Sequence, residues 1–501
     1  MNSRLRSATP ARPAALAAAT LTAVLMAVAG CTPTPAAEHQ SGGADEPSPA
    51  DDRFTVVTPE DVPELTEQSL TTSHRFAVSG GYPAVAGADA LNERLADAVD
   101  QRISGFTALS PEAEAFGMEW EVTAAADGVL GVRLVLTEKD GDGERAAYET
   151  HWYDAGTGRA AYSTELLAGQ EELRAFQDLV LARLEGDREV DPAALQPVLG
   201  LYDSLGFTAD GDLVVEFDEG QVAPVGAGRV SAVVPGDDAG PLLSELGTRA
   251  RAAAQEPEEG FTVEPVEPDG ERTPVPGIPA DWADHVDCTA PETKCVALTF
   301  DDGPGSRTPE LLDTLAEHDA PATFFQTGRM IDRFPDTLRR AYAEGHEIGN
   351  HTIDHPDLTG LDEAGIRAEL APVNERIRRE TGAVPVVMRP PYGATNDAVA
   401  AVTREQGLSQ ILWNIDTEDW RDRDAEIVAE RAVDGAEPGA IILMHDIHGT
   451  TVDAVPAVLD DLTAQGYTFA TVSQMLGETE PGSLHYSRGN PTLPAESGPD
   501  A

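Results

Sequence analysis

From Val296 onward the chain alternates short apolar segments with amphipathic ones, and this alternation limits the fold more than any other feature. Repeated strand–helix pairs require parallel strands, because a helix has to carry the chain back to the start of the next strand. The pattern predicts an α/β fold, barrel-like or doubly wound, with its active-site residues at the carboxyl ends of strands. We expect strands at residues 296–300, 322–327, 386–388, 409–413 and 440–444, and helices at residues 309–318 and 335–344.

The preceding residues, 53–250, mix strand-like and helix-like patterns, which predicts a smaller α+β accessory region. Residues 31–52 and 251–284 are rich in proline and acidic residues and predict linkers, and the polar residues 479–501 predict a disordered tail. The α/β domain then occupies residues 285–478. Within the α+β region we expect strands at residues 130–137, 213–217 and 230–234, and helices at residues 90–103 and 170–184.

The N-terminus carries Arg4, Arg6 and Arg12, then an alanine-rich apolar run at residues 14–30, then Cys31. Basic residues followed by a short apolar run and small residues predict a secretory signal at residues 1–30. A cysteine directly after Ala-Gly resembles a bacterial lipobox, which implies a lipid on Cys31. We therefore expect an extracytoplasmic protein that is held at the outer face of the cell membrane by a lipid anchor only. An ordinary signal peptide and a single spanning helix are the alternatives.

Acidic side chains dominate the composition, with 88 Asp and Glu against 34 Lys and Arg and a formal net charge of −54. Such a chain repels polyanions, so nucleic acid is excluded as a partner. Cys288 and Cys295 lie close together in a loop-like stretch, which outside the cytosol predicts a disulfide. A zinc site at this point would need further ligands.

Two segments carry residues suited to a metal site. Asp301 and Asp302 follow a predicted strand, where one carboxylate can bind a cation while the other handles a proton; a turn with two solvated acids is the alternative. His351 and His355 are four residues apart, a spacing that places both on one face of a helical turn. Two imidazoles and one carboxylate make a three-ligand site for a catalytic divalent metal, and a surface pair of histidines is the alternative. A His-Glu-x-x-His metalloprotease site is excluded, because the histidine after His346-Glu347 comes one residue too late.

Three further segments also lie near predicted strand ends. The first, Arg389-Pro-Pro-Tyr-Gly, is a rigid turn that can direct an arginine and a backbone N–H toward a pocket. The second, residues 413–420, contains acids between two tryptophans, and the third is Leu443-Met-His-Asp. A histidine beside an acid partner can act as a general acid, although a buried structural histidine is the alternative.

Taken in order, these five segments resemble the motifs of the polysaccharide deacetylase family, carbohydrate esterase family 4, whose shared region is called the NodB homology domain. The resemblance covers residues 290–478 and shows no departure from the five motifs. It implies a distorted (β/α) barrel as the catalytic domain, so the expected fold class is α/β, with a smaller α+β domain in front of the barrel.

The resemblance also implies a role for each residue. Asp302, His351 and His355 are expected to hold a divalent metal, usually Zn²⁺ and in some members Co²⁺ or another divalent ion. Asp301 is expected to be the general base for the attacking water. Arg389 is expected to orient Asp301 and keep it ionised, and the backbone N–H of Tyr392 is expected to stabilise the oxyanion.

The resemblance also implies that His445 is the general acid and that Asp419 holds it. Leu443 and Trp420 are expected to line the acetyl pocket.

The N-terminal region has a second, weaker resemblance, to the extracellular domain of lysozyme-sensing anti-sigma factors, carried by segments such as Tyr82-Pro-Ala-Val-Ala-Gly and Tyr153-Asp-Ala-Gly-Thr-Gly. It implies a wall-facing or protein-binding module, with a plain spacer as the alternative. Together the features predict metal-dependent removal of acetyl groups from peptidoglycan N-acetylglucosamine or N-acetylmuramic acid. Deacetylation of chitin oligosaccharides or acetyl-xylan is an alternative, as is a non-catalytic sensor or wall-binding lipoprotein.

Overall fold

The structure is a computed structural model that describes residues 52–70, 75–264, 266, 274–279, 287–288, 290 and 293–489. The predicted signal peptide and Cys31 lie outside the described residues. Among the residues that are described, no helix combines the length and apolarity needed to cross a membrane.

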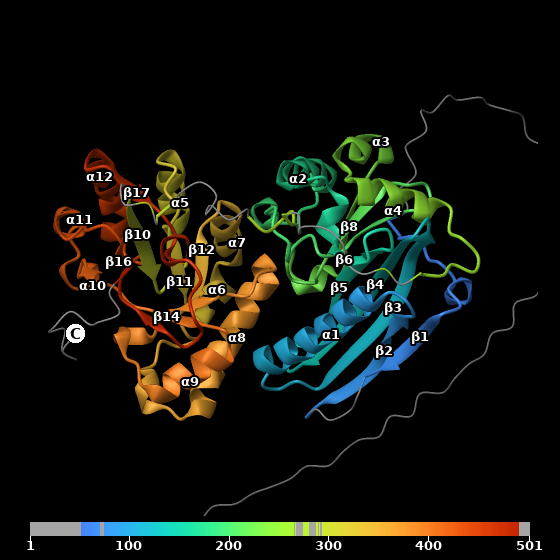
Figure 1. The fold of residues 1–501 in the computed structure, drawn as a ribbon, viewed down its shortest axis with the longest axis horizontal. Helices are drawn as coiled ribbons and strands as arrows, with labels where there is room; N and C mark the ends of the chain where they lie inside the picture. The colour runs from blue at the N-terminus through green and yellow to red at the C-terminus, as the bar shows by residue number, and fades with distance from the viewer. Residues whose placement is uncertain are drawn as a thin grey trace, which may run out of the picture. The chain divides into compact units, whose positions relative to one another are not determined.

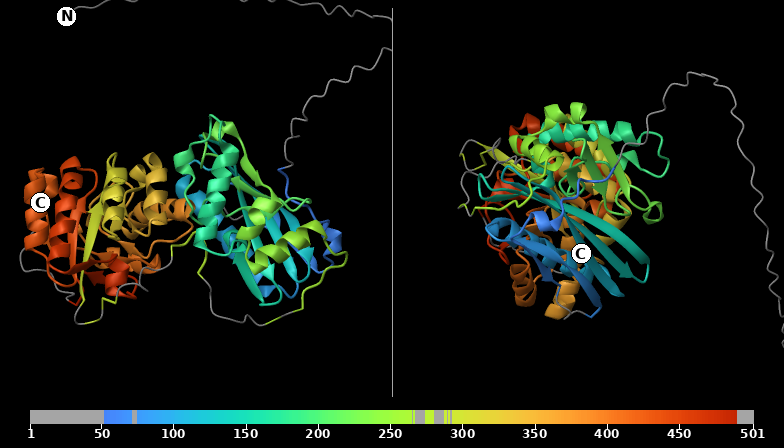
Figure 2. Two further views of the ribbon diagram at one scale, coloured as in Figure 1. Left: turned by 90° about the horizontal axis from the view of Figure 1, so that it is seen from above. Right: turned by 90° about the vertical axis from the view of Figure 1, so that its right-hand side faces the viewer.

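The N-terminal region is an α+β structure with two sheets, as predicted (Figure 1). The six-stranded sheet, drawn in blue to teal, is visible in the right-hand view of Figure 2. Its neighbouring strands are antiparallel except β2 and β3, and the three-stranded sheet is antiparallel throughout. The six strands are β1 (Leu65–Ser69), β2 (Ala77–Val85), β3 (Ala115–Ala126), β4 (Val129–Asp140), β5 (Gly143–Asp154) and β6 (Arg159–Tyr162). The three are β7 (Leu205–Phe207), β8 (Leu213–Phe217) and β9 (Val230–Val234).

Helices cover these sheets with their apolar faces. In α1, Leu91, Leu95 and Val99 recur every four residues and are buried in one core with Phe116 and Leu134 of the larger sheet. The helices of this region are α1 (Asp89–Leu109), α2 (Gln170–Leu184), α3 (Gly236–Ala239) and α4 (Glu245–Gln255). The predicted bounds of α2, β8 and β9 are confirmed, whereas α1 and β4 extend beyond their predicted ends.

The C-terminal region contains nine parallel strands in the order β15-β16-β10-β11-β12-β13-β14-β18, with β17 beside β10. The far edge curls back to β16, because Ser487 bridges to Ala440 and the Arg488 N–H donates to the Gly439 carbonyl at 2.8 Å. The sheet is therefore a distorted (β/α) barrel, as expected. Its strands are β10 (Lys294–Asp301), β11 (Thr323–Gln326), β12 (Glu347–Asn350), β13 (Val387–Met388), β14 (Ser409–Ile411), β15 (Ile415–Asp416), β16 (Ala440–His445), β17 (Tyr467–Phe469) and β18 (Leu484–His485).

Helices surround these strands in Figure 1. They are α5 (Thr308–Glu317), α6 (Gly328–Arg333), α7 (Pro335–Ala343), α8 (Glu363–Thr381), α9 (Asp397–Glu405), α10 (Asp419–Asp422), α11 (Ala425–Asp434), α12 (Gly449–Ala464) and α13 (Val472–Leu476). The longest, α8, begins at Asp362, whose carboxylate accepts the Gly365 N–H, and ends at Gly382 with φ +84°. Asp362 and Gly382 therefore cap the two ends of α8 and fix where this helix begins and ends.

Strand β10 is buried on both faces, as is usual for a central parallel strand. Val296, Leu298 and Phe300 pack in the core that contains the apolar residues of α5 and α12, whereas Cys295 and Ala297 pack in a second core on the opposite face of the strand. Side chains alternate along a strand, so Asp301 lies on the face of Ala297, away from α5 and α12. The strand thus delivers an acid to the barrel side of its carboxyl end.

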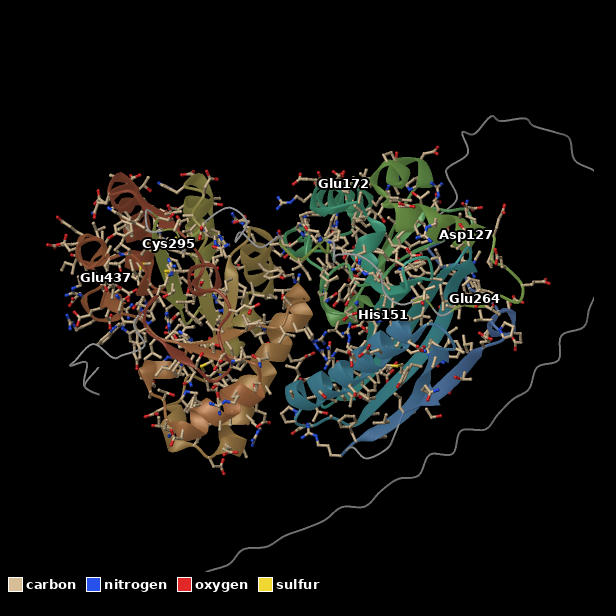
Figure 3. All side chains as sticks on the ribbon, in the orientation of Figure 1. Asp127, His151, Glu172, Glu264, Cys295 and Glu437 are labelled. Carbon is tan, nitrogen blue, oxygen red and sulfur yellow. A yellow bond between two sulfur atoms is a disulfide. The ribbon has the colours of Figure 1, made fainter. Side chains whose placement is uncertain are left out.

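Two further features concern the ends of this domain. Cys288 is joined to Cys295 of β10 by a disulfide, and Figure 3 labels Cys295 on that strand.

The expectation of a disordered tail from residue 479 is wrong for the described residues 479–489, because β18 pairs with β14 and the Leu412 N–H donates to the His485 carbonyl. These backbone bonds to a distant strand leave no local trace in a polar, glycine-containing sequence.

Candidate active site

The predicted site residues converge at the carboxyl ends of the parallel strands. Asp301 ends β10, His445 ends β16, and the strand register places these two residues opposite each other. His351 directly follows β12 and Arg389 directly follows β13, whose neighbouring residues Asn350 and Met388 are also in register. The parallel sheet therefore assembles segments that are far apart in the sequence along one edge.

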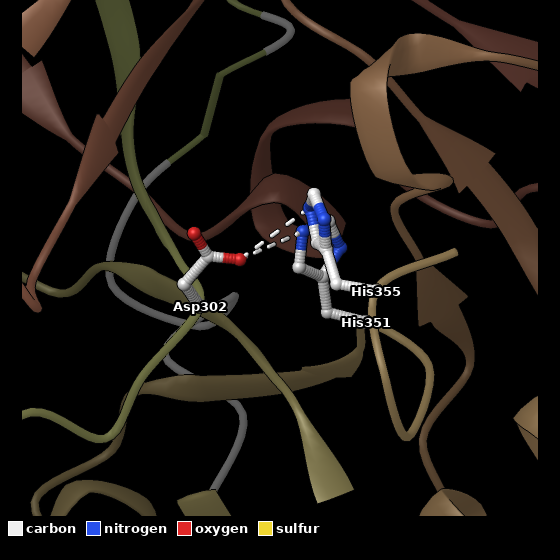
Figure 4. A group of neighbouring side chains, drawn as sticks. All are labelled: Asp302, His351 and His355. Carbon is white, nitrogen blue, oxygen red and sulfur yellow. Dashed lines mark ion pairs between the residues drawn. The ribbon is translucent and has the colours of Figure 1, made fainter. Parts of the chain in front are cut away.

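The three expected metal ligands form a group whose donor atoms all lie within 4.8 Å of one another. One oxygen of Asp302, Oδ1, lies 3.5 Å from Nε2 of His351 and 3.5 Å from Nε2 of His355, and Figure 4 shows both rings directed at this carboxylate. The donor set of two imidazole nitrogens and one carboxylate oxygen suits a divalent transition metal with open coordination positions. The residues present therefore fit the metal that the sequence predicts.

The expectation of a helical turn at His351–His355 is wrong. Thr352 and His355 have φ angles of +68° and +56°, so the segment is a loop outside any helix. Asn350 holds this loop, because its Oδ1 accepts the Thr352 N–H at 2.8 Å. The loop still brings the two rings together, with centroids 4.9 Å apart. Positive φ at non-glycine residues is costly and is typical of functional sites.

The side-chain pKa is shifted in a different direction or by a different cause in each of the three expected ligands. Burial raises the pKa of Asp302, but the hydrogen bond from His351 and the nearby histidine charges outweigh it and hold that pKa below its ordinary value. Burial lowers the pKa of His351, but Asp301 and Asp302 outweigh it and raise it above the ordinary value. Burial and His351 lower the pKa of His355. Asp302 and His355 therefore lose their protons at lower pH than free side chains do, whereas His351 retains its proton to higher pH, and a cation binds only the deprotonated forms.

His351 is also held from behind. Its Nδ1 lies 2.7 Å from the backbone carbonyl of Arg389, so this nitrogen carries the proton and Nε2 faces Asp302. A hydrogen bond of this kind orients a metal-binding imidazole and fixes its tautomer. His346, by contrast, accepts the Ala322 N–H through Nδ1 and lies outside the metal group.

Asp301 is buried and bonded to a fully buried arginine. Arg389 Nη1 donates to Asp301 Oδ1 at 2.7 Å and to Thr299 Oγ1 at 2.8 Å. The remaining guanidinium nitrogens donate to the carbonyls of Ile411 and Leu412, each at 3.0 Å. Four acceptors thus fix the guanidinium, and the guanidinium in turn orients one oxygen of Asp301. The other oxygen, Oδ2, lies 3.7 Å from Nε2 of His351, beside the metal group.

His445 is paired with Asp419. Its Nδ1 lies 2.8 Å from Asp419 Oδ1, and its backbone N–H donates to Asp419 Oδ2 at 2.8 Å. Burial lowers the pKa of His445, but the hydrogen bond to Asp419 and the charges of Asp419, Asp301 and Asp302 outweigh it and raise the pKa to about 9. His445 is therefore protonated at neutral pH and can donate a proton through Nε2.

The structure also places the residues expected around the acetyl pocket. Tyr392 is 65% exposed, has φ +61° and contacts His355 edge-on with ring centroids 4.6 Å apart. Leu443 is buried in β16, two residues before His445, and the backbone N–H of Trp420 donates to Asp419 Oδ1 at 2.9 Å. Sequence reasoning missed Thr299, which accepts from Arg389, and Thr451, whose hydroxyl donates to Asp419 Oδ2 at 2.6 Å. Buried threonines within a strand or helix look like ordinary packing residues.

Known proteins resemble the C-terminal region of this chain. A family profile described as polysaccharide deacetylase matches residues 289–411. A chitooligosaccharide deacetylase from Rhizobium leguminosarum is 36% identical over 194 residues, which are 36% of this chain and 90% of that protein. The chain belongs to the polysaccharide deacetylase family.

Two other relatives match this chain over a stretch of similar length. The peptidoglycan-N-acetylglucosamine deacetylase PgdA of Listeria monocytogenes is 44% identical over 190 residues, 38% of this chain and 40% of PgdA. The peptidoglycan-N-acetylmuramic acid deacetylase PdaC of Bacillus subtilis is 39% identical over 186 residues, 37% of this chain and 39% of PdaC. The match to this chain thus covers about two fifths of each of these two proteins.

Proposed function

We propose that this protein hydrolyses N-acetyl groups on cell-wall glycan, the N-acetylglucosamine or N-acetylmuramic acid residues of peptidoglycan, and releases acetate. The observation that supports this most strongly is the register of β10 and β16. It sets an Arg-held carboxylate, Asp301, opposite an Asp-held imidazolium, His445, with the metal group beside Asp301. Amide hydrolysis needs a base and an acid placed in this way.

Each residue then has a distinct task. Asp302, His351 and His355 hold the divalent metal, for which Zn²⁺ is the first expectation. When bound, such a cation lowers the pKa of water and polarises a carbonyl oxygen. Asp301, oriented by Arg389, accepts the proton of the attacking water.

The remaining residues act on the acetamide. The backbone N–H of Tyr392 donates to the oxygen that becomes negative in the transition state. His445 Nε2 gives its proton to the leaving amine, which departs poorly without one. Trp420 and Leu443 line the pocket for the acetyl methyl group, whose small size suits a closed apolar end.

The test compares Asp301→Asn and His351→Ala with the wild-type protein on purified cell wall, with released acetate as the readout. We expect both variants to lose activity by at least about 100-fold, because each removes a group required in the transition state. Asp313→Asn, at an exposed carboxylate paired with Arg340, is the matched control and should retain full activity. Acetate release by His351→Ala at the wild-type rate would refute the metal assignment.

A second substrate class, chitin oligosaccharides, is favoured by the Rhizobium relative, which is named for that activity. Wild-type protein is to be compared on peptidoglycan, chitin oligomers and acetylated xylan, with mass spectrometry of the products to locate each lost acetyl group. Peptidoglycan should give the highest kcat/KM. A preference for short chitin oligomers would reassign the substrate and leave the chemistry intact.

We further propose that a lipid attached to Cys31 anchors the enzyme at the outer face of the cell membrane, and that the α+β region is a wall-facing or protein-binding module. Support comes from the basic and apolar sequence before Cys31. When cells are labelled with radioactive palmitate, the full-length Cys31→Ser protein should carry no label and should leave the membrane fraction. Equal label in the variant would refute lipidation at this residue.

A further inference from the structure

Asp446 directly follows His445 and is buried, with 1% of its surface exposed. Its Oδ2 accepts a hydrogen bond from Thr308 Oγ1 at 2.5 Å, and that hydroxyl oxygen accepts the Gly305 N–H at 2.7 Å. One threonine therefore connects the Asp446 carboxyl group to the turn that follows Asp302.

The carboxyl group of Asp446 also lies directly against this turn. A Cβ atom added to Gly303 would lie 2.2 Å from Oδ1 and 2.3 Å from Oδ2 of Asp446, which is closer than a Cβ atom approaches any atom to which it is not bonded. Asp446 thus occupies the space that a side chain at position 303 would take. The neighbouring residue is Asp302, whose φ of +70° is unusual for a residue other than glycine.

The opposite side of the turn is held by the chain after β11. The Thr327 N–H donates to the Gly303 carbonyl at 3.2 Å, and the Thr327 hydroxyl lies 3.4 Å from the Asp302 carbonyl. The turn is therefore held from two sides, and on one side the contact comes from the residue next to His445.

The placement of Asp446 is unfavourable for stability. Its Oδ1 has no hydrogen-bond partner among the described residues, and a buried polar atom without a partner is destabilising. An apolar side chain of similar size would fill this space without that cost, so packing alone does not account for an acid here.

We propose that Asp446 is a positioning residue that fixes the turn of the metal ligand Asp302 against the chain segment of the acid His445. Through Thr308 and the close contact with Gly303, it keeps the ligand and the acid in one relative geometry. The part concerning His445 rests on the proposed function, whereas the part concerning Asp302 requires only that the site binds a metal.

The test uses the full-length chain and titration with Co²⁺, because metal affinity reports on the turn independently of catalysis. Asp446→Ala and Gly303→Ala should each weaken Co²⁺ binding by about tenfold, the lower end of the range for groups that support metal ligands. Asp446→Asn should recover most of the affinity, because the amide keeps the shape and an acceptor for Thr308. Thr308→Val, which removes the connecting hydroxyl and keeps the volume, should weaken binding in the same direction.

The double variant Gly303→Ala/Asp446→Ala decides whether the contact is direct. Removal of the carboxyl group opens the space that the new methyl group needs, so the combined loss should be clearly smaller than the product of the two single losses. Losses that simply multiply would overturn the inference, as would a folded Asp446→Ala protein with wild-type Co²⁺ affinity.

Activity separates the two halves of the inference. In Asp446→Ala, kcat should fall more than KM rises, and the alkaline limb of the pH profile, which reports on His445, should shift. Failure of the wild-type protein to bind Co²⁺ would refute the proposed function itself. Normal Co²⁺ binding and acetate release in wild-type, Asp446→Ala and Gly303→Ala proteins alike would refute only the role of Asp446.

Discussion

Asp419 bonds His445 twice, through the ring Nδ1 at 2.8 Å and through the backbone N–H at 2.8 Å. The carboxylate thus fixes the orientation of the ring as well as its charge. A histidine with a raised pKa stays protonated, and can act as an acid, until the pH rises through that pKa. The pairing with Asp419 should therefore extend activity to alkaline pH. The pKa of His445 is about 9, so kcat/KM of the wild-type protein should fall only near or somewhat below that pH.

Asp419→Asn should move this alkaline limb toward the ordinary histidine pKa of about 6.5, because the largest stabilising partner of the imidazolium loses its charge. At pH 8 we expect a loss of about 100-fold or more, the range for a general acid. The measurement is a pH profile of acetate release. Asp460→Asn removes the exposed carboxylate beside His318 and is the control, with an unchanged profile. Identical alkaline limbs in wild-type and Asp419→Asn proteins would exclude His445 as the acid.

Thr451→Val tests the hydroxyl that donates to Asp419 Oδ2, the oxygen that also accepts the backbone N–H of His445. Burial raises the pKa of Asp419, but hydrogen bonds from His445 and Thr451 contribute to holding it below its ordinary value. Loss of a hydrogen bond to a charged group should lower the free energy of unfolding by about 1.5–3 kcal/mol. It should also shift the alkaline limb slightly downward, because a less firmly held carboxylate stabilises the imidazolium less.

Thr403→Val is the matched control for this variant. Thr403 is equally buried and donates its hydroxyl to the neutral carbonyl of Val399 at 2.9 Å, in α9. In Thr403→Val the free energy of unfolding should fall by only about 1 kcal/mol, and the pH profile should stay that of the wild-type protein. Melting temperatures and pH profiles of the two variants distinguish a site effect from loss of a buried hydroxyl. Equal effects of both variants on the profile would contradict the role of Thr451.

Metal binding should depend on pH through His351. Its pKa is raised in the free site, and a cation can bind its Nε2 only after the proton leaves, so affinity should rise with pH and level off above the pKa of His351. Below that pKa we expect up to about tenfold weaker Co²⁺ binding for each pH unit, which corresponds to one released proton. Calorimetric titrations in buffers of different ionisation enthalpy measure that proton directly.

Two variants control the metal experiment. His355→Ala should weaken Co²⁺ binding by at least about 100-fold, because it removes a ligand. His318→Ala, at a histidine of the surface that pairs with Asp460, should leave binding unchanged. Affinity that does not vary between pH 5.5 and 8 would contradict the assignment of His351 as a ligand that must first lose a proton.

Strand patterns allowed the positions of some candidate residues to be predicted, whereas the role of each residue came from the resemblance to the deacetylase motifs. Asp301, Arg389 and His445 directly follow apolar segments, and parallel strands bring such ends to one edge. The register that sets Asp301 opposite His445 joins strands far apart in the chain, and no local pattern encodes it.

The failures have physical reasons of the same kind. The spacing of His351 and His355 suits a helix, but Asn350 caps Thr352 in a left-handed conformation and makes a loop instead. The strand β18 depends on backbone bonds to β14, which a polar sequence does not reveal. Propensity describes the local chain, whereas tertiary contacts decided both cases.

Arg389→Lys tests the group that holds the base. The guanidinium donates to four acceptors on different sides, and a single ammonium group cannot reach Asp301 and the carbonyls of Ile411 and Leu412 together. Buried acceptors left without a donor should lower the free energy of unfolding by about 2–4 kcal/mol. The kcat should fall by at least about tenfold, because Asp301 loses its fixed orientation.

Co²⁺ affinity should stay within a few-fold in this variant, because the contact from Arg389 to His351 is made by the backbone carbonyl, which lysine retains. Arg376→Lys is the matched control. Arg376 bonds the exposed carboxylate of Asp332 through two nitrogens, so its replacement should lower the free energy of unfolding by less than about 1 kcal/mol and leave kcat unchanged. Wild-type kcat in Arg389→Lys would show that Asp301 does not need the guanidinium, and the base would then have to be positioned by the metal group alone.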